Sequence, residues 1–163
     1  MFCGGFEYSI DDKGRLIFPS RFRSSLGERF IITKGVGGCL FVLTEDHWRK
    51  NYYDRFTNNP SLDEHSLRVG RFFCAGFAEA SADSQGRVAI PQHLRDHAGL
   101  ALQSEAMVVG VSNRVEVWSK DRWAKYNDSV SEQDLAASIL VTGIGTPWSN
   151  TTVDDKARDE NRA

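Results

Sequence analysis

Apolar and polar residues alternate near the start of the chain, in the pattern of a half-buried strand. Phe6, Tyr8 and Ile10 are apolar or aromatic, and the residues between them are polar, which is the period of a strand with one covered face. Segment 11–14 supplies turn residues and ends in a glycine that can adopt positive φ. Apolar character resumes over residues 15–18. The pattern therefore predicts a hairpin.

A short helix and a second hairpin are predicted downstream. Pro19 suits the first turn of a helix, and Gly27 suits its C-terminal end. Two apolar runs, 30–33 and 39–43, flank a glycine-rich loop and indicate the second hairpin. Thr44 then supplies a natural N-cap for the helix that follows.

The same order of elements occurs twice along the chain. Residues 83–95 align with residues 11–23 at a constant offset of 72. The offset grows to 75 where Ser119 answers Thr44, so the second copy has about three extra loop residues. Repetition at a fixed spacing indicates a duplicated structural unit. The identical pairs are Asp11 and Asp83, Gly14 and Gly86, Arg15 and Arg87, Pro19 and Pro91, and Arg23 and Arg95.

The repeat divides the chain into four predicted parts, and the fold class is α+β. Residues 1–60 form the first unit and residues 74–128 the second. Between them, residues 61–73 predict a linking helix that opens with a capping-box pattern at Ser61. Residues 129–163 form a C-terminal extension, whose end is rich in turn-forming and charged residues and is expected to be mobile.

Charge is distributed unevenly between the two ends of the chain. The whole chain holds 20 basic and 22 acidic residues, a net charge of −2. Residues 128–163 contain seven of the acids and three of the bases, and the remaining 17 bases and 15 acids lie before them. The main part of the chain thus has a balance of +2. Any contact with DNA must then come from local clusters or from several subunits together.

Several classes of protein do not fit this sequence. No run of about 18 apolar residues exists, so no membrane span is expected. The N-terminus lacks a secretory signal pattern, and we expect a cytoplasmic protein. The motifs GxSxG, GxGxxG, HExxH and the Walker phosphate loop are absent from the sequence. We therefore expect no enzymatic activity, no cofactor and no small-molecule substrate.

A metal site is not expected either. Cys3, Cys39 and Cys74 lie far apart, without the spacing of zinc ligands. They are interpreted as free thiols in a reducing compartment. His93 and His97 are four residues apart, and we interpret this pair as part of a solvated helix face.

The repeated turn, with the pattern D-x-x-G-R, is the candidate functional site. A turn at the end of a two-stranded ribbon projects from the body of a protein, and such a ribbon can enter the major groove of DNA. Lys13, Arg15 and Arg87 would then lie where the ribbon touches the duplex. Arginine can pair with guanine through two hydrogen bonds or bind a phosphate. Arg21 and Arg23 are candidate secondary contacts, although the place of Arg23 beside the hairpin favours a structural role.

The same turn allows a second interpretation of equal weight. Asp11 precedes Arg15 by four residues, so its carboxylate could cap the turn and pair with the guanidinium. Such ion pairs are common and individually weak, and duplication alone would explain the second occurrence. Both interpretations can hold together, because the carboxylate would fix the pose of the arginine. The residues that would support the two turns are Asp11, Gly14, Asp83 and Gly86.

These motifs resemble the MraZ proteins of bacteria, which belong to the AbrB-like group of swapped-hairpin transcription factors. Segments 11–15 and 19–23 carry the resemblance, together with 83–87 and Pro91, and it covers roughly residues 1–140. It implies tandem AbrB-like units with short flanking helices. It further implies a homo-oligomeric ring, larger than a dimer, that binds repeated promoter elements in double-stranded DNA. Such a ring represses the division and cell-wall gene cluster, including its own gene, at the nucleoid.

The resemblance also implies roles for single residues. Arg15 and Arg87 would be the principal DNA contacts, with Lys13 in support. Gln85 stands where the first copy has Lys13, so the second motif has one positive side chain fewer. The alternative function is a non-DNA interaction protein, either an antitoxin-like partner binder or an oligomeric scaffold. A shift of the protein's own promoter fragment, but not of a scrambled one, would separate these functions.

Overall fold

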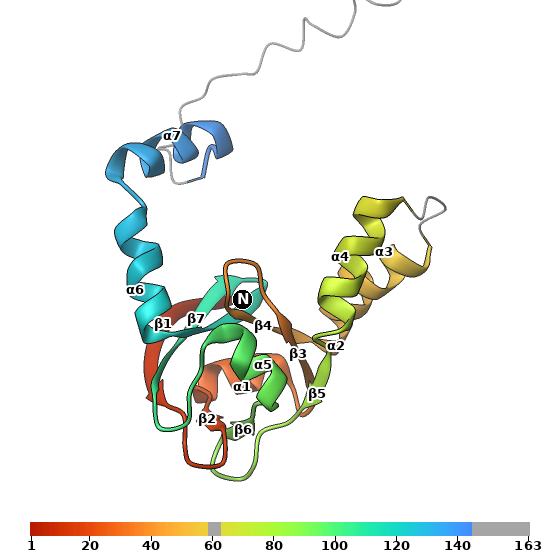
Figure 1. Cartoon of the computed structure of the whole chain (residues 1–163), viewed down its shortest axis with the longest axis vertical. Coiled ribbons are helices and arrows are strands. Elements are labelled where there is room, and N and C mark those ends of the chain that lie inside the picture. Colours follow the sequence, from red (N-terminus) through yellow and green to blue (C-terminus); the bar gives the residue numbers. More distant parts are fainter. Residues whose placement is uncertain (59–62, 145–163) are drawn as a thin grey trace, which may run out of the picture. The chain divides into compact units, whose positions relative to one another are not determined.

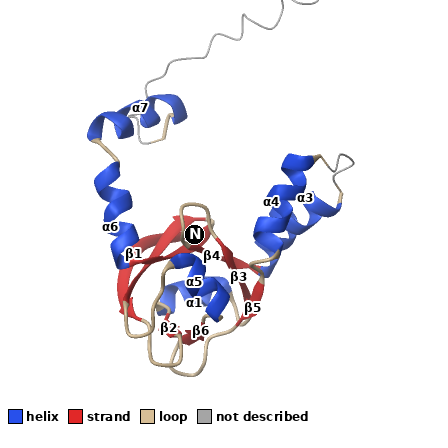
Figure 2. Ribbon diagram, in the orientation of Figure 1, coloured by secondary structure: helices blue, strands red, loops and turns tan. Residues whose placement is uncertain are grey.

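The chain has an α+β fold built on antiparallel strands (Figures 1 and 2). The computed structural model describes residues 1–58 and 63–144. It divides into one compact unit, Met1–Tyr126, and a second unit that begins at Asn127. Over the described ranges, no helix has the length and apolar character needed to cross a membrane. The predicted mobile end of the extension, from residue 145 onward, lies outside the described residues.

Six strands of the first unit form one antiparallel sheet. The hairpins β3–β4 and β7–β8 confirm the second hairpin predicted for each repeat. Strand β1 pairs along its whole length with β7, a strand of the other repeat. In spatial order the strands are β1 (Phe2–Ser9), β7 (Glu105–Ser112), β8 (Arg114–Ser119), β4 (Leu40–Thr44), β3 (Phe30–Lys34) and β5 (Ala78–Ala80).

Two further strands, β2 (Arg15–Ile17) and β6 (Arg87–Ala89), form a small antiparallel sheet of their own, and Val88 of β6 also makes an isolated bridge to Ala82. The predicted hairpin between residues 6–10 and 15–18 is therefore wrong, because the strands on either side of the first turn pair with strands of the second repeat. The reason lies in the core. Leu16 and Val88 stand opposite each other at the centre of this pair, and both are completely buried. The two repeats are thus interleaved.

The helices that follow these short strands have the predicted ends. Helix α1 (Ser20–Leu26) begins after Pro19, and α5 (Gln92–Ala98) begins after Pro91. They end at Gly27 and Gly99, both with positive φ. Both helices pack against β4, where they cover one face of the six-stranded sheet with apolar side chains.

Two other helices begin at the predicted N-caps. The Thr44 hydroxyl accepts the His47 backbone N–H at 3.1 Å, and the Ser119 hydroxyl accepts that of Arg122 at 3.4 Å. The helix after Thr44 is α2 (Glu45–Trp48), which continues through a π-helical stretch, η1 (Arg49–Tyr53), into α3 (Asp54–Thr57). The helix after Ser119 is α6 (Lys120–Ser129).

The remaining helices are α4 (Glu64–Cys74) and, in the second unit, α7 (Glu132–Thr142). The predicted start of the linking helix at Ser61 lies outside the described residues, and the described helix begins after Asp63. Asp63 is its N-cap, and the Asp63 carboxylate accepts the Ser66 backbone N–H at 2.7 Å.

The main core is shared by both repeats. Phe18 and Phe30 stack with ring centroids 6.0 Å apart, and Phe22 and Leu94 are almost fully buried beside them. A second cluster, which includes Phe41, lies on the opposite face of the sheet, since successive residues of a strand point to opposite faces. Neither repeat encloses a core of its own strands alone.

Candidate nucleic-acid interface

The first repeated turn is closed by a single carboxylate. Oδ1 of Asp11 accepts the backbone N–H groups of Lys13, at 2.9 Å, and Arg15, at 2.8 Å. Oδ2 of the same group accepts the Nε–H of Arg15 at 2.7 Å. Gly14 has a φ of 73°, in the left-handed region that favours glycine. The turn is thereby fixed at both its backbone and its arginine.

The second turn repeats this geometry almost atom for atom. Oδ1 of Asp83 accepts the backbone N–H groups of Gln85 and Arg87, both at 2.9 Å, and Oδ2 accepts the Arg87 Nε–H at 2.8 Å. Gly86 has a φ of 79°. In both turns, then, the aspartate caps the turn and pairs with the arginine, as the second interpretation of the sequence predicted.

The pairing leaves part of each arginine unused. Nε is committed to the aspartate, whereas the terminal nitrogens of Arg15 and Arg87 have no hydrogen-bond partner among residues 1–58 and 63–144. The two side chains are 26% and 30% exposed. Each guanidinium thus has a fixed pose and free donors, the combination that recognition of a phosphate or a base edge requires.

These contacts also shift the pKa of both carboxyls. Desolvation raises the pKa of Asp11, but the hydrogen bonds from Arg15 and the Lys13 backbone outweigh it, so that the net shift is downward. The pKa of Asp83 is lowered chiefly by the backbone and side-chain hydrogen bonds from Arg87. Both groups are therefore ionised at neutral pH and keep the arginines in place.

The pairing of β2 with β6 brings both arginines to one face. Arg15 stands opposite Ala89, and Arg87 stands opposite Ile17. Opposed residues of an antiparallel pair share a face, so these four residues line the outside while Leu16 and its partner face the core. Arg15 and Arg87 are diagonal neighbours on that face, a relation that places their Cα atoms roughly 7–8 Å apart.

The two turns lie at opposite ends of this strand pair. Ile90 donates its backbone N–H to the Gly14 carbonyl at 3.0 Å, and Phe18 donates to the Gly86 carbonyl at 3.0 Å. Figure 1 shows both loops at the same edge of the unit, next to β2 and β6. We call the outer face of the pair, with its two turns, the arginine ribbon (residues 11–17 and 83–89). It replaces the projecting hairpin tip that the sequence predicted.

Two other arginines hold the turns from inside. Arg23 donates its Nε–H to the Phe18 carbonyl at 3.0 Å, and its guanidinium covers Gly86, where an added Cβ would lie 2.8 Å from Cζ. Arg95 does the same at the Ile90 carbonyl, at 3.1 Å, and covers the glycine of the first turn. Each arginine thus supports the turn of the other repeat.

The structure does not bring every predicted basic residue to the ribbon. Arg21 is exposed on α1, and its guanidinium lies over the Phe22 ring, 5.9 Å from the centroid, with a terminal nitrogen near Gly4 of β1. In contrast, Ile17 is 43% exposed in the middle of the ribbon. Ile17 was not predicted as part of the site, although its place two residues after Arg15 puts it on the same face of a strand.

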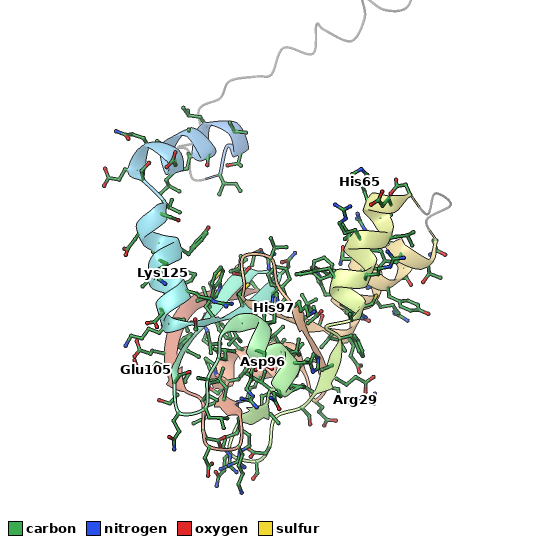
Figure 3. All side chains as sticks on the ribbon, in the orientation of Figure 1. Arg29, His65, Asp96, His97, Glu105 and Lys125 are labelled. Atoms are coloured by element: carbon green, nitrogen blue, oxygen red, sulfur yellow. The ribbon has the colours of Figure 1, made fainter. Side chains whose placement is uncertain are left out.

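A second surface feature surrounds the β3–β4 loop. Hollows of about 370 and 420 Å³ flank it, and Val36, at the tip, is 69% exposed and lines both. His97 lines the smaller hollow, where its Nε2 lies 3.1 Å from the Gly35 carbonyl oxygen (Figure 3). The prediction of a solvated face is therefore wrong for His97, because α5 packs against this loop.

The larger hollow is lined in part by an ion pair between Arg114 and Glu116. Arg114 lies 2.7 Å from the buried Glu116 carboxylate and covers the Phe41 ring at 4.5 Å. Trp118 donates its indole N–H to the same carboxylate at 3.0 Å. With its charge and lone pairs engaged, Glu116 is poorly suited to act as a general acid or base.

Within the described residues, the thiols and the metal-binding residue types do not gather into one site. Cys3 and Cys74 are exposed, Cys39 is buried, and all three are free, as predicted. Burial raises the pKa of the Cys39 thiol to about 12, so it is not a nucleophile at neutral pH. No cluster of three metal-ligating His, Cys, Asp or Glu side chains occurs in the described parts of the chain.

Comparison with known proteins gives consistent matches. A family model described as MraZ protein and as antitoxin-like matches residues 1–72 and again residues 73–139. A transcriptional regulator MraZ from Alkaliphilus metalliredigens is 44% identical over 146 residues, which cover 88% of this chain and all of the relative. The same protein from Acetivibrio thermocellus is 42% identical with the same coverage.

Comparison with solved structures gives only a weak likeness. One match is the solution structure of a protein from Pyrococcus horikoshii, with 18% identity and a TM-score of 0.30. The match covers 72% of this chain and 88% of that one. A score this low does not bear on the fold.

Proposed function

This chain belongs to the MraZ family, whose curated relatives are named transcriptional regulators, and we propose that it binds double-stranded DNA through the arginine ribbon. One observation carries the proposal. Two arginines, each paired through Nε with the aspartate of its own turn and each with unused terminal nitrogens, lie on one face of a two-stranded ribbon.

The chemistry of the ribbon suits a duplex. Each guanidinium is held through Nε, so its terminal N–H groups offer the fork that matches a phosphate or the O6 and N7 atoms of guanine. A two-stranded ribbon fits the width of the major groove. Lys13 and Gln85, both exposed in the turns, extend the contact at either end. Arg21 and Arg23 remain candidates for secondary contacts with the backbone of the DNA.

The domain organisation proposed with this function is a tandem, interleaved pair of AbrB-like swapped-hairpin units. They occupy residues 1–60 and 74–128, with 61–73 as the linking helix and 129–163 as a C-terminal extension. The antiparallel pairing of β1 with β7 and of β2 with β6 supports the exchange of strands between units. The family model's two successive matches support the duplication.

The wider role follows from the family. We propose a non-enzymatic repressor that acts at the nucleoid on the division and cell-wall gene cluster, including its own gene. In this role it would form a homo-oligomeric ring larger than a dimer, bound to repeated promoter elements. The small positive balance of a single main unit supports a multivalent assembly, because one ribbon offers few charges to a duplex.

A second candidate function is a protein-binding module. The apolar hollows beside Val36 favour it, as does the antitoxin-like description of the matched family model. In that case the loop would hold a partner protein, and the ribbon would serve only to complete the core.

Replacement of Arg15 separates these functions. Arg15→Ala should weaken binding to the protein's own promoter fragment by roughly 1–3 kcal/mol for each lost contact. The melting temperature should change little, because the arginine is at the surface and its ion pair is weak. Arg49→Ala, which removes the same charge from an exposed helical site, is the control and should bind as the unmodified protein does. Unchanged binding by Arg15→Ala, or unfolding, would favour the structural role.

A further inference from the structure

The two turns of the arginine ribbon match in geometry but differ in the two residues at their middle. The first turn has Asp12 and Lys13 between its aspartate and glycine, and the second has Ser84 and Gln85. The residues that build the turns, Asp, Gly and Arg, are the same in both. The ribbon therefore has the same backbone geometry at both ends but different exposed side chains there.

We propose that Lys13 and Gln85 read different bases, guanine and adenine respectively, and thereby fix the direction in which each subunit lies on DNA. The proposal rests on the proposed function, because it concerns the same surface. It adds which residues set specificity and orientation.

The structure makes the two positions equivalent. The backbone N–H of Lys13 and that of Gln85 each donate to the aspartate Oδ1 of their own turn, both at 2.9 Å. Both residues are exposed. In the described portions of the chain, neither side chain has a hydrogen-bond partner. The two side chains therefore leave matching backbone positions and are available to a ligand.

Net charge does not distinguish the two ends. Lys13 is neighboured by the carboxylate of Asp12, whereas Gln85 is neighboured by the hydroxyl of Ser84. Counted as pairs, both ends are neutral, so the simple difference in charge noted from the sequence disappears. What differs is the pattern of donors and acceptors.

That pattern matches different base edges. The ammonium of Lys13 has only donors, which suits the two acceptors that guanine presents in the major groove, N7 and O6. The amide of Gln85 has a donor and an acceptor, which suits the N7 and N6 groups of adenine. Each end of the ribbon would therefore prefer a different base.

Orientation follows from this difference. A ribbon with identical ends would bind its element equally well in both directions, just as two-fold symmetric proteins bind palindromic sites. With different ends, one direction is favoured. Subunits that all lie in the same direction along DNA then require direct rather than inverted repeats.

The experiment exchanges the two ends. Sequences bound by the full chain are selected from a random duplex library, and affinities are measured by fluorescence anisotropy for single-base changes in the selected element. The unmodified protein should lose roughly 5- to 150-fold in affinity when the guanine under Lys13 or the adenine under Gln85 is changed. The double variant K13Q/Q85K should bind the same element in the opposite direction, which exchanges the two positions cut by a DNA-cleaving chelate attached at one site on the protein.

A matched control exchanges charge without exchanging the amide. D12S/S84D moves the carboxylate from one end to the other and should keep the original direction of the element. If K13Q/Q85K binds the element in its original direction, or if D12S/S84D binds it in the opposite direction, the inference is overturned and DNA binding stands. If the unmodified protein enriches no sequence, the proposed function itself fails. Thermal melting of each variant confirms that it is folded.

Discussion

Each aspartate of the arginine ribbon accepts three hydrogen bonds, two from backbone N–H groups and one from an arginine Nε. The carboxylate therefore closes the turn and orients the guanidinium in one step. The structural and the DNA-binding interpretations concern different nitrogens of the same side chain, so they do not compete. In this arrangement, loss of Asp11 would release Arg15 as well as the turn.

The carboxyls give a prediction about pH. Because the pKa values of Asp11 and Asp83 are lowered in the folded state, their stabilising contribution is fully present above the ordinary value of 3.8 and is lost as the pH falls through the lowered value. We expect NMR titration of the side-chain carboxyl carbons to give midpoints below 3.8. DNA binding should then show no dependence on these groups from about pH 5 to pH 8.

Single arginine variants assign the cause of the shift. Arg15→Ala should raise the pKa of Asp11 toward 3.8 and leave that of Asp83 unchanged, and Arg87→Ala should do the reverse. A midpoint at or above the ordinary value in the unmodified protein would show that the ion pairs do not form in solution.

At the scale of elements, each turn is held by an arginine from the helix of the other repeat. Arg95 of α5 lies against Gly14, and Arg23 of α1 lies against Gly86. The short strands β2 and β6 also join the two repeats, through the buried side chains of Leu16 and Val88 at their centre. The ribbon is thus rigid only when both repeats are folded together, which couples the geometry of the site to the whole core.

Gly14→Ala tests this arginine contact. Alanine is strained at a φ of 73°, and its Cβ would lie 2.8 Å from Nε of Arg95. We expect the free energy of unfolding, measured with urea, to fall by more than about 1 kcal/mol. In the double variant Gly14→Ala/Arg95→Ala the overlap is gone and only the backbone strain remains. The two substitutions should therefore be coupled by about 0.5–3 kcal/mol. Additive effects would show that the arginine does not cover the glycine.

The elements that could be predicted are those with short-range signals. The caps at Thr44 and Ser119 depend on residues three positions away, and both were predicted correctly. The pairing of β2 with β6 could not be predicted in this way. It depends on the burial of Leu16 against Val88, a contact between residues 72 positions apart, and the local pattern is equally compatible with a hairpin.

The candidate site shows the same limit. The repeated motif was enough to identify Arg15 and Arg87 as a pair, because identical residues recur at one offset. Their common face was not predictable, since it follows from the register between two strands that the sequence assigned to separate hairpins. The contact of His97 with the β3–β4 loop was missed for the same reason, because it joins residues 62 positions apart.

At the scale of the whole molecule, the ribbon of one chain is a weak ligand for DNA. Non-specific complexes have dissociation constants of about 10⁻⁴ to 10⁻⁶ M at physiological salt, and two arginines should do no better. Linking several ribbons in one particle makes later contacts intramolecular, which raises avidity by roughly 10²–10⁴. Assembly is therefore as important to the proposed function as the ribbon itself.

Val36→Asp tests whether the β3–β4 loop forms a subunit contact of the proposed assembly. Val36 is exposed between two apolar hollows, and a charge in a buried subunit contact is strongly unfavourable. We expect light scattering to show smaller particles for this variant, with an unchanged melting temperature. Leu102→Asp is the control, since Leu102 is also exposed but lines neither hollow. Particles of unchanged size would place the subunit contact elsewhere.

The spacing of the DNA target depends on the same assembly. Ribbons carried by one particle can bind together only if successive elements face the same side of the duplex, so we expect direct repeats spaced by about 10–10.5 base pairs. Inserting half a helical turn between two repeats should lower the affinity steeply, because the second element then faces away. Inserting a full turn should lower the affinity less, because the second element faces the same side and is only farther away.

Binding to these duplexes is measured by anisotropy, with the single-element duplex as the reference for a ribbon acting alone. Val36→Asp provides the internal comparison, because smaller particles should lose the advantage of a second element and, with it, the sensitivity to spacing. Light scattering of the unmodified protein at micromolar concentration should give a mass larger than that of a dimer. A monomer under these conditions would overturn the assembly, and affinity that ignores the half-turn insertion would overturn the geometry even if the assembly is present.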